Sequence, residues 1–331
     1  MDDIVTISVD ALGGDNAPGV VLDGVAQALE ADEKLFVVLC GPEDVVEPFA
    51  QQHERCIARV TTEEIGMAEH PANAVRKKKD SSIVVGCRLV KEGAADGFFS
   101  AGSTGACLAA GTLVMGRIKG VARPALATVV PSPAKPVVLC DVGANADCKP
   151  EYLVQFAHMA SAYATLVMGV KNPRVGLLNI GEEEEKGSQF AQQAHAMLKQ
   201  NVENFGGNAE GRDVMNGPYD VIVCDGFTGN VCLKTIEGTA KVLFGELKSI
   251  MKASFITKLG ALTMKGGLKG LLGRIDPDAA GGAPLLGVKG ACIVGHGSSS
   301  ARAVKNGVLA AADYVRSGVT ETIAQSIAKT S

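Results

Sequence analysis

The stretch IVTISVDALGGDNAP, residues 4–18, contains the pattern that decides the fold. A β-branched apolar run is followed by a cluster of Gly, Asp and Asn, and then by Pro18. Proline suits the first turn of a helix, where its missing N–H is not needed. The same order of apolar run and polar cluster, in most cases followed by a helical pattern, recurs five more times. The six apolar runs are 4–9, 97–99, 137–140, 175–179, 221–224 and 291–294.

Strands that alternate with helices predict a mostly parallel sheet with helices on both faces. We therefore expect a three-layer α/β/α, Rossmann-like fold over residues 1–331 as a single catalytic domain, from which a helical arm at 246–275 projects. Parallel strands place their carboxyl ends at one edge of a sheet. The six polar loops are thus expected to share one edge and to build one site there.

Composition excludes several functional classes. With 331 residues, 47% of them hydrophobic, the chain can bury a large core, and a net charge of −4 argues against nucleic-acid binding. Nine cysteines without CxxC or Cys/His spacing predict neither zinc nor disulfides, and we expect no metal. The acidic start lacks the features of a signal peptide, and no uninterrupted apolar stretch is long enough to span a membrane. A cytoplasmic protein is expected.

Two loops suit an anion. SAGSTGA (100–106) and GHGSSS (295–300) each follow a strand and open a helix, where free N–H groups favour negative charge. Ser103 and Thr104 add hydroxyl donors. The alternative is that Ser and Thr only cap the helices. The absence of GxxxxGK[ST], GxGxxG and GxSxG motifs argues against a nucleotide phosphate and against a serine hydrolase.

Two further loops carry candidate donors of another kind. In GEEEEKG (181–187), Lys186 is the one cation among four acids, which would keep its ammonium charged to hold a phosphate or polarise a carbonyl. The alternative is a surface lysine in a salt bridge. In DGFTGN (225–230), Thr228 and Asn230 offer neutral donors, although Asn230 would also suit a helix N-cap.

The remaining two loops are acidic turns. Asp10 with Gly13 and Gly14, and Asp141 with Asn145, follow strands with a spacing that fits no EF-hand, so we expect these acids to brace their loops. His296 is the only histidine in a motif loop. It suits either general acid–base catalysis or a structural hydrogen bond, and the sequence leaves both open.

Residues 246–275 differ from the rest of the chain. Apolar residues recur at helical spacing among six cations, and Gly266–Gly267 predicts a division into two helices. Such a basic amphipathic segment suits a membrane surface, a dimer arm, or both roles together. Its lysines would also suit an acidic carrier protein. The residues of interest are Leu259, Leu262, Lys258 and Lys265.

Seven motifs in order resemble one known family. They lie at residues 10–18, 100–106, 141–145, 179–187, 225–230, 281–287 and 295–299, and the resemblance covers essentially the whole chain. The pattern is similar to that of the bacterial phosphate acyltransferase (PlsX) family, the acyl-acyl-carrier-protein:phosphate acyltransferases of phospholipid synthesis. Leu12 stands where Met is usual, and Ser103 stands where Asn is usual, so that a hydroxyl replaces an amide donor.

The resemblance implies that acyl carrier protein thioester and inorganic phosphate become acyl phosphate and free carrier protein. It also implies a homodimer and a fold similar to phosphate acetyltransferases and to the isocitrate/isopropylmalate dehydrogenase group. The product would feed a membrane glycerol-3-phosphate acyltransferase, with possible peripheral contact of this protein with the inner face of the membrane. No cofactor is implied, because the phosphopantetheine arrives on the carrier protein.

This chemistry agrees with the loops. Phosphate is itself the nucleophile, so the protein needs donors and positioning but no activated Ser or Cys. We expect Lys186 and Asn230 to be the catalytic donors. The residues expected to bind substrate are Asp10, Gly13, Gly14, Ser103, Thr104, Asp141, Asn145, Asp225, Thr228, His296 and Ser298.

Three other functions remain as alternatives. One is a phosphate acetyltransferase that uses short acyl-CoA. Another is an NAD-dependent β-decarboxylating dehydrogenase, against which the missing acid clusters and arginine-rich motif weigh. The third is a non-enzymatic scaffold bound to a membrane through residues 246–275.

Overall fold

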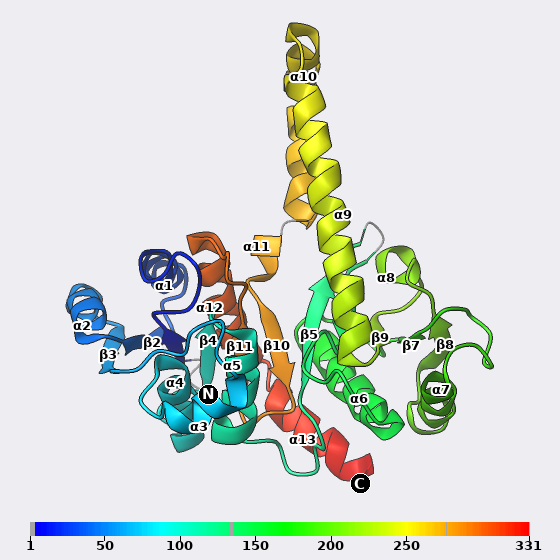
Figure 1. Ribbon diagram of the computed structural model, residues 1–331, viewed down its shortest axis with the longest axis horizontal. Coiled ribbons are helices and arrows are strands. Elements are labelled where there is room, and N and C mark those ends of the chain that lie inside the picture. The colour runs from blue at the N-terminus through cyan, green and yellow to red at the C-terminus, as the bar shows by residue number, and fades with distance from the viewer. Residues whose placement is uncertain (1–3, 133–134, 276, 331) are drawn as a thin grey trace.

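The computed structural model describes residues 4–132, 135–275 and 277–330, without the side chains of residues 259, 265, 268–275, 277 and 330. Figure 1 shows a wide body with one helical pair projecting far beyond it. The body is built on an 11-stranded sheet with the order β3-β2-β1-β4-β11-β10-β5-β6-β9-β7-β8. The strands are β1 (Val5–Asp10), β2 (Leu35–Gly41), β3 (Cys56–Val60), β4 (Gly97–Ser100), β5 (Ala125–Val130), β6 (Val137–Cys140), β7 (Val175–Leu178), β8 (Phe205–Ala209), β9 (Val221–Val223), β10 (Ala283–Leu286) and β11 (Ala291–Val294).

Helices cover both faces of this sheet. Phe98 and Phe99 are successive residues of β4, and their side chains point to opposite faces, as in any strand. Phe98 lies in a cluster with residues of α4, whereas Phe99 lies in a cluster with residues of α1 and α12. The three-layer α/β/α fold with a mostly parallel sheet, predicted from the alternation of apolar runs and helical patterns, is therefore confirmed.

The helices follow the strands in the expected order. They are α1 (Gly19–Ala31), α2 (Glu43–Gln52), α3 (Pro71–Lys77), α4 (Ser82–Glu92), α5 (Thr104–Ala110) with the π-helical turn η1 (Gly111–Met115), α6 (Pro150–Leu166), α7 (Gln189–Asn201), α8 (Asp213–Asn216), α9 (Gly226–Lys252), α10 (Phe255–Ile275), α11 (Pro277–Ala280), α12 (Ala301–Arg316) and α13 (Val319–Thr330). Within the described ranges, no helix has the length and apolar composition needed to cross a membrane.

The expectation of one shared sheet edge is wrong. β3, β2, β1, β4 and β11 are parallel, but the pairs β11–β10, β10–β5 and β5–β6 are antiparallel. These three reversals make β6, β9, β7 and β8 run opposite to β1. In a flat sheet the two sets of carboxyl ends would therefore face opposite edges.

The twist of the sheet counteracts much of this reversal. Adjacent strands rotate by about 20–25°, so the five steps from β4 to β9 turn the strand direction by roughly 100–125°. The two sets of carboxyl ends therefore do not face opposite directions. The polar loops form two groups on the two halves of the sheet.

The projecting arm is longer than expected and is divided elsewhere. α9 runs unbroken for 27 residues from the body to the tip, and α10 returns beside it (Figure 1). The break comes at Ala253–Ser254, where Ser254 Oγ accepts the N–H of Thr257 and Thr257 Oγ1 accepts the N–H of Ser254. Gly266 and Gly267 lie inside α10, so the predicted division there is wrong. An interior glycine costs about 1 kcal/mol relative to alanine, which weakens a helix without ending it.

Candidate active site

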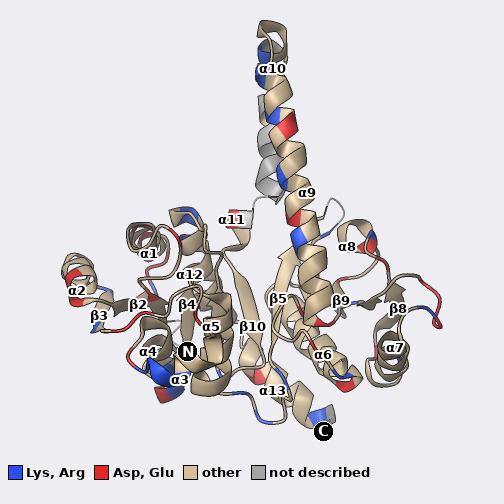
Figure 2. Cartoon of the chain, viewed as in Figure 1, with Lys and Arg blue, Asp and Glu red and all other residues tan. Residues whose placement is uncertain are grey.

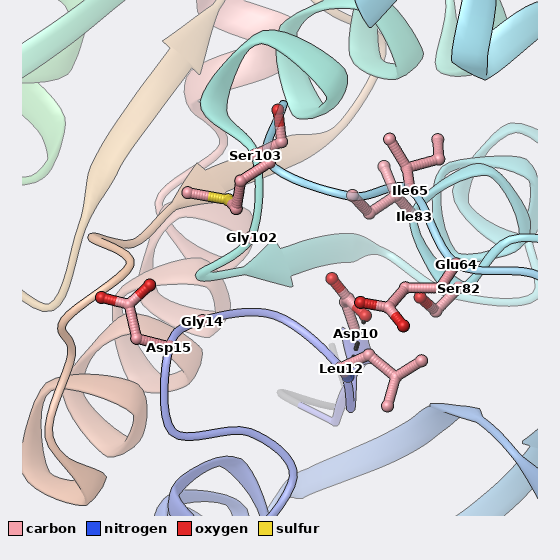
Figure 3. Close-up of a pocket in the computed structure, with 11 residues that line it drawn as sticks. Asp10, Leu12, Gly14, Asp15, Glu64, Ile65, Ser82, Ile83, Gly102 and Ser103 are labelled. Carbon is pink, nitrogen blue, oxygen red and sulfur yellow. Dashed lines mark hydrogen bonds between the residues drawn. The ribbon is translucent and has the colours of Figure 1, made fainter. Parts of the chain in front are cut away.

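The first group joins the loops that follow β1, β4 and β11. The Asp15 N–H donates to Gly297 O at 2.7 Å, and the Gly295 N–H donates to Ser100 O at 2.8 Å. A Cβ on Gly13 would lie 2.8 Å from Gly102 N, so only glycine permits this approach of the two loops. Figure 3 shows the two loops on opposite sides of one hollow.

Asp10 holds this group together. Its buried carboxylate accepts the Ser100 hydroxyl at 2.7 Å and the Leu12 N–H at 3.0 Å, and Ser100 Oγ accepts the Gly102 N–H at 2.9 Å. Burial raises the pKa of the Asp10 carboxyl, against hydrogen bonds from Ser82 and Ser100 that lower it. A carboxylate that is buried and bonded in this way is suited to fixing the loop that it touches.

A cavity of about 140 Å³ opens between these loops (Figure 3). Besides Asp10 and Asp15, its lining includes residues that the sequence analysis did not select, namely Glu64, Ile65, Met67, Ser82 and Ile83. Ser82 is the first residue of α4. Residues 64–67 come from the connection after β3, and no local pattern indicates that this connection reaches the loop after β1.

Two serines of this group serve as helix caps. Ser103 Oγ accepts the Ala106 N–H at the start of α5, and Ser300 Oγ accepts the Ala303 N–H at the start of α12. The capping alternative is thus realised at Ser103, while Thr104 is exposed beside it. His296 Nδ1 lies 2.8 Å from Ser298 Oγ and accepts the Ser298 N–H at 3.2 Å. These bonds order the loop and leave both side chains exposed.

The second group consists of the loops that follow β6 and β9, which are bonded to each other, and the loop that follows the neighbouring strand β7. The Gly226 N–H donates to Asn145 O at 2.7 Å. The buried Asp141 carboxylate accepts five hydrogen bonds, from the N–H groups of Leu126, Gly143, Ala144 and Asn145 and from the Asn145 amide. Burial raises the pKa of Asp141, and the hydrogen bonds oppose this shift. Asp141 therefore braces the loop, as the acidic turn predicted.

Asp225 begins α9 as its N-cap. Its carboxylate accepts the Thr228 N–H at 2.8 Å and the Thr228 hydroxyl at 2.7 Å. The alternative in which Asn230 caps this helix is therefore wrong, because Asn230 lies inside the first turns of α9. Its exposed amide lies beside Gly143, with Cγ 3.8 Å from the position of a Cβ there. Among the described residues, Asn230 has no side-chain hydrogen bond.

Lys186 lies in the loop after β7, which pairs in parallel with β9 so that Leu177 is level with Val223. Two of the four acids around Lys186 are paired elsewhere: Glu182 with Arg212 at 3.2 Å, and Glu184 with Lys199 at 2.6 Å. The exposed Lys186 ammonium itself has no ion-pair partner in the part of the chain that the structure describes. A surface salt bridge is thus not what holds this lysine.

The predicted arm residues lie on the projecting helices. Leu262 is 65% exposed and Lys258 is also exposed, whereas the side chains of Leu259 and Lys265 lie outside the described ones. Phe255 and Ile256, each 81% exposed, occupy the tip. In the described residues no group of three His, Cys, Asp or Glu side chains is arranged to hold a metal ion.

The fold is that of the phosphotransacylases. The structure resembles a phosphotransacetylase from Streptococcus pyogenes, with a TM-score of 0.61 and 15% identity over 95% of each chain. It also resembles a branched-chain phosphotransacylase from Enterococcus faecalis V583, with a TM-score of 0.60 and 14% identity over 94% of this chain and 99% of the other. At such low identity these likenesses define the fold alone.

Sequence comparison identifies the family. Residues 5–322 match the family described as "Fatty acid synthesis protein", to which this chain belongs. A phosphate acyltransferase of Desulfitobacterium hafniense strain Y51 is 49% identical over 324 residues, which are 97% of this chain and 96% of that protein. A phosphate acyltransferase of Clostridium perfringens strain SM101 is 46% identical over 330 residues, 98% and 97% of the two chains. The predicted family and an acyltransferase activity are confirmed.

Proposed function

We propose that the protein forms acyl phosphate from acyl-[acyl-carrier-protein] and inorganic phosphate, with Lys186 and Asn230 as the catalytic donors. One observation carries this assignment. Most polar side chains of the second loop group are bonded within the protein, whereas Lys186 and Asn230 are exposed and, among the described residues, without polar partners. They follow the paired strands β7 and β9, so their loops begin side by side.

The reaction is an acyl transfer in two stages. A phosphate oxygen attacks the thioester carbonyl carbon, and the carbonyl oxygen becomes an oxyanion. The C–S bond then breaks, and the carrier thiolate leaves and takes up a proton. An ammonium and an amide positioned at these oxygens would stabilise the developing charge, and such a donor is typically worth about 3–4 kcal/mol.

The other predicted residues would support this chemistry in two ways. The hydroxyls of Ser103, Thr104 and Ser298, with His296, are proposed to hold phosphate. Asp10, Asp141 and Asp225 are proposed to act by fixing loops, because their carboxylates are engaged by the protein. Gly13, Gly14, Asn145 and Thr228 belong to the same loop framework. We propose no resident cofactor, since the phosphopantetheine arrives with the substrate.

The arm suggests how the protein is placed in the cell. Large apolar side chains remain exposed along α9 and α10, including Leu243 at 63% and Ile250 at 59%, besides the two at the tip. We propose a homodimer that covers the faces of the arm, with its tip in peripheral contact with the inner face of the cell membrane. From this cytoplasmic position the acyl phosphate would pass to a membrane glycerol-3-phosphate acyltransferase.

Two variants separate these roles of the arm. Ile256→Glu at the tip should reduce flotation with anionic liposomes while leaving the dimer intact, because it removes apolar contact without touching the helix faces. Leu243→Glu, on the face of α9, should instead shift the protein toward monomer in size-exclusion chromatography. Unchanged flotation of Ile256→Glu with intact dimers would refute the membrane role.

The central test is phosphate dependence. The purified protein should release carrier thiol from long-chain acyl carrier protein only when phosphate is present, and hydroxylamine should trap acyl phosphate as the hydroxamate. The likeness to phosphotransacetylases makes acetyl-CoA the informative second substrate. Faster turnover of acetyl-CoA than of the long-chain carrier thioester would favour the phosphate acetyltransferase alternative, and no phosphate-dependent release from either would exclude both.

A further inference from the structure

Three exposed cations lie together at the end of α3. We call Arg76, Lys77 and Lys79 the basic ridge. Figure 2 shows blue on α3, at the end of the molecule that lies away from the tip of the arm. Lys78, between them, is engaged differently. It pairs with Glu69 at 2.7 Å and donates to Glu64 O at 2.6 Å. The chain as a whole carries a net charge of −4, so attraction to an acidic partner needs a local patch of this kind.

The basic ridge is attached to the first loop group. Pro71, at the start of α3, packs so closely on α5 that a Cβ on Gly105 would lie 2.5 Å from its Cγ. The bonds of Lys78 fix the connection 62–70, which lines the cavity with Glu64, Ile65 and Met67. The ridge therefore adjoins the connection 62–70, which lines the cavity together with Asp10 and Ser103.

Apart from its edge at Ser103, where phosphate is proposed to bind, the lining of this cavity is unsuited to an anion. Three carboxyl groups line it, from Asp10, Asp15 and Glu64, together with apolar side chains such as Ile65 and Ile83. Carboxylates repel an anion, but they accept hydrogen bonds from neutral amides. A chain with amide N–H groups and hydrocarbon between them fits such a lining. The pantetheine arm of an acyl carrier protein has this chemistry.

We propose that the acidic carrier protein docks on the basic ridge and passes its pantetheine arm into the adjoining cavity. This inference rests on the proposed function, which supplies the carrier thioester as substrate. The carrier's acidic surface and the phosphodiester at the base of its arm would meet Arg76, Lys77 and Lys79. A carrier bound there leaves the tip of α9 and α10 free, because the two surfaces lie at different ends of the molecule (Figure 2).

Charge reversal on two surfaces tests the docking. The double variant Lys77→Glu/Lys79→Glu should raise KM for the carrier thioester by about tenfold, with little change in kcat, because lost attraction slows encounter. The matched control is Lys248→Glu/Lys252→Glu on the arm, the other lysine-rich surface, and it should leave KM within about twofold. With acyl-pantetheine, which lacks the protein, both variants should match the wild type. Added salt should raise the wild-type KM for the carrier thioester and affect the ridge variant less.

A third variant tests the cavity. Met67→Trp places a larger side chain at an exposed position of the lining, so the fold should survive. The variant should slow turnover of the carrier thioester and of acyl-pantetheine alike.

Equal KM values for the ridge and arm variants, or a rise only for the arm variant, would overturn the docking site. So would a ridge variant that loses binding to anionic vesicles but keeps its KM. Failure of the proposed function looks different, since the wild type would then release no thiol in response to phosphate.

Discussion

The two loop groups are both held together by a buried aspartate, but they differ in which side chains remain without a partner in the described part of the chain. In the first group, Asp10 ends β1 and accepts the hydroxyl of Ser100, at the end of the neighbouring strand β4. In the second, Asp141 follows β6, and the Asn145 that it orders accepts the Gly226 N–H after the neighbouring β9. Each half thus ties adjacent loops together through a buried acid. Such acids must be bonded where they lie, because an unpaired buried carboxylate is costly.

The difference lies in the remaining side chains. The first group surrounds a cavity with carboxyl groups, backbone groups and capping hydroxyls. The second group offers one ammonium and one amide without polar partners among the described residues. We infer that the first half positions substrate and the second half stabilises charge. The predictions below test this division.

Lys186→Ala should have the largest effect. Turnover should fall roughly 100-fold or more, which corresponds to a loss of about 2.7 kcal/mol of transition-state stabilisation. The melting temperature should not change, because the side chain is exposed. The measurement is phosphate-dependent thiol release. Lys199→Ala, which removes a lysine paired with Glu184 nearby, is the matched control and should keep most of its activity. Near-normal turnover of Lys186→Ala would end the assignment.

Asn230→Ala should follow, with a loss of about tenfold to 100-fold in kcat. A neutral donor is weaker than a charged one, so the loss should be smaller than for Lys186→Ala. The control is Asn201→Ala, because within the described ranges the amide of Asn201 bonds only to Met197 O of α7. If Asn230→Ala kept the full kcat, the assignment of Asn230 as a catalytic donor would be wrong.

Gly13→Ala should break the first group through its geometry. The new Cβ would lie 2.8 Å from Gly102 N, so the loops must separate, at a cost of about 1–3 kcal/mol in the free energy of unfolding. Urea denaturation measures this cost. Gly19→Ala has open space around its Cβ and should leave stability unchanged or slightly raised. Equal stability of the two variants would contradict the close approach of the loops.

Asp10→Asn should have the smallest effect, visible in the pH dependence of stability. Burial raises the pKa of Asp10 above 3.8, so the folded state holds its proton more tightly than the unfolded state. The contribution of Asp10 to the free energy of unfolding is therefore fully present below pH 3.8. It is lost as the pH rises through the raised pKa of the folded state. Asparagine does not titrate, so the wild type should lose stability relative to Asp10→Asn over this window. A constant difference between the two proteins, measured by urea denaturation from pH 3.5 to pH 7, would contradict the shift.

The sequence by itself determined most of the strands, the polar loops that follow them and the family. Each depends on neighbouring residues: apolar runs mark buried strands, and Gly, Asp and Ser clusters mark the turns and caps that follow. The sequence could also predict that Asp141 braces its loop and that Ser103 caps a helix, because both roles depend on neighbouring residues.

Only the tertiary structure decided how these pieces meet. β10 and β5 enter the middle of the sheet as antiparallel neighbours, and the strand β10, from the 281–287 motif, was not recognised in the sequence. This insertion divides the six loops into two groups. Residues 64–67 line the cavity with the loop after β1, held by the bond from Lys78 to Glu64 O and by the packing of Ile65 in one apolar cluster with Ile83 of α4, which no local pattern encodes. Strand order and direction depend on contacts between residues far apart in the chain, so the partition of the site is a property of the folded sheet.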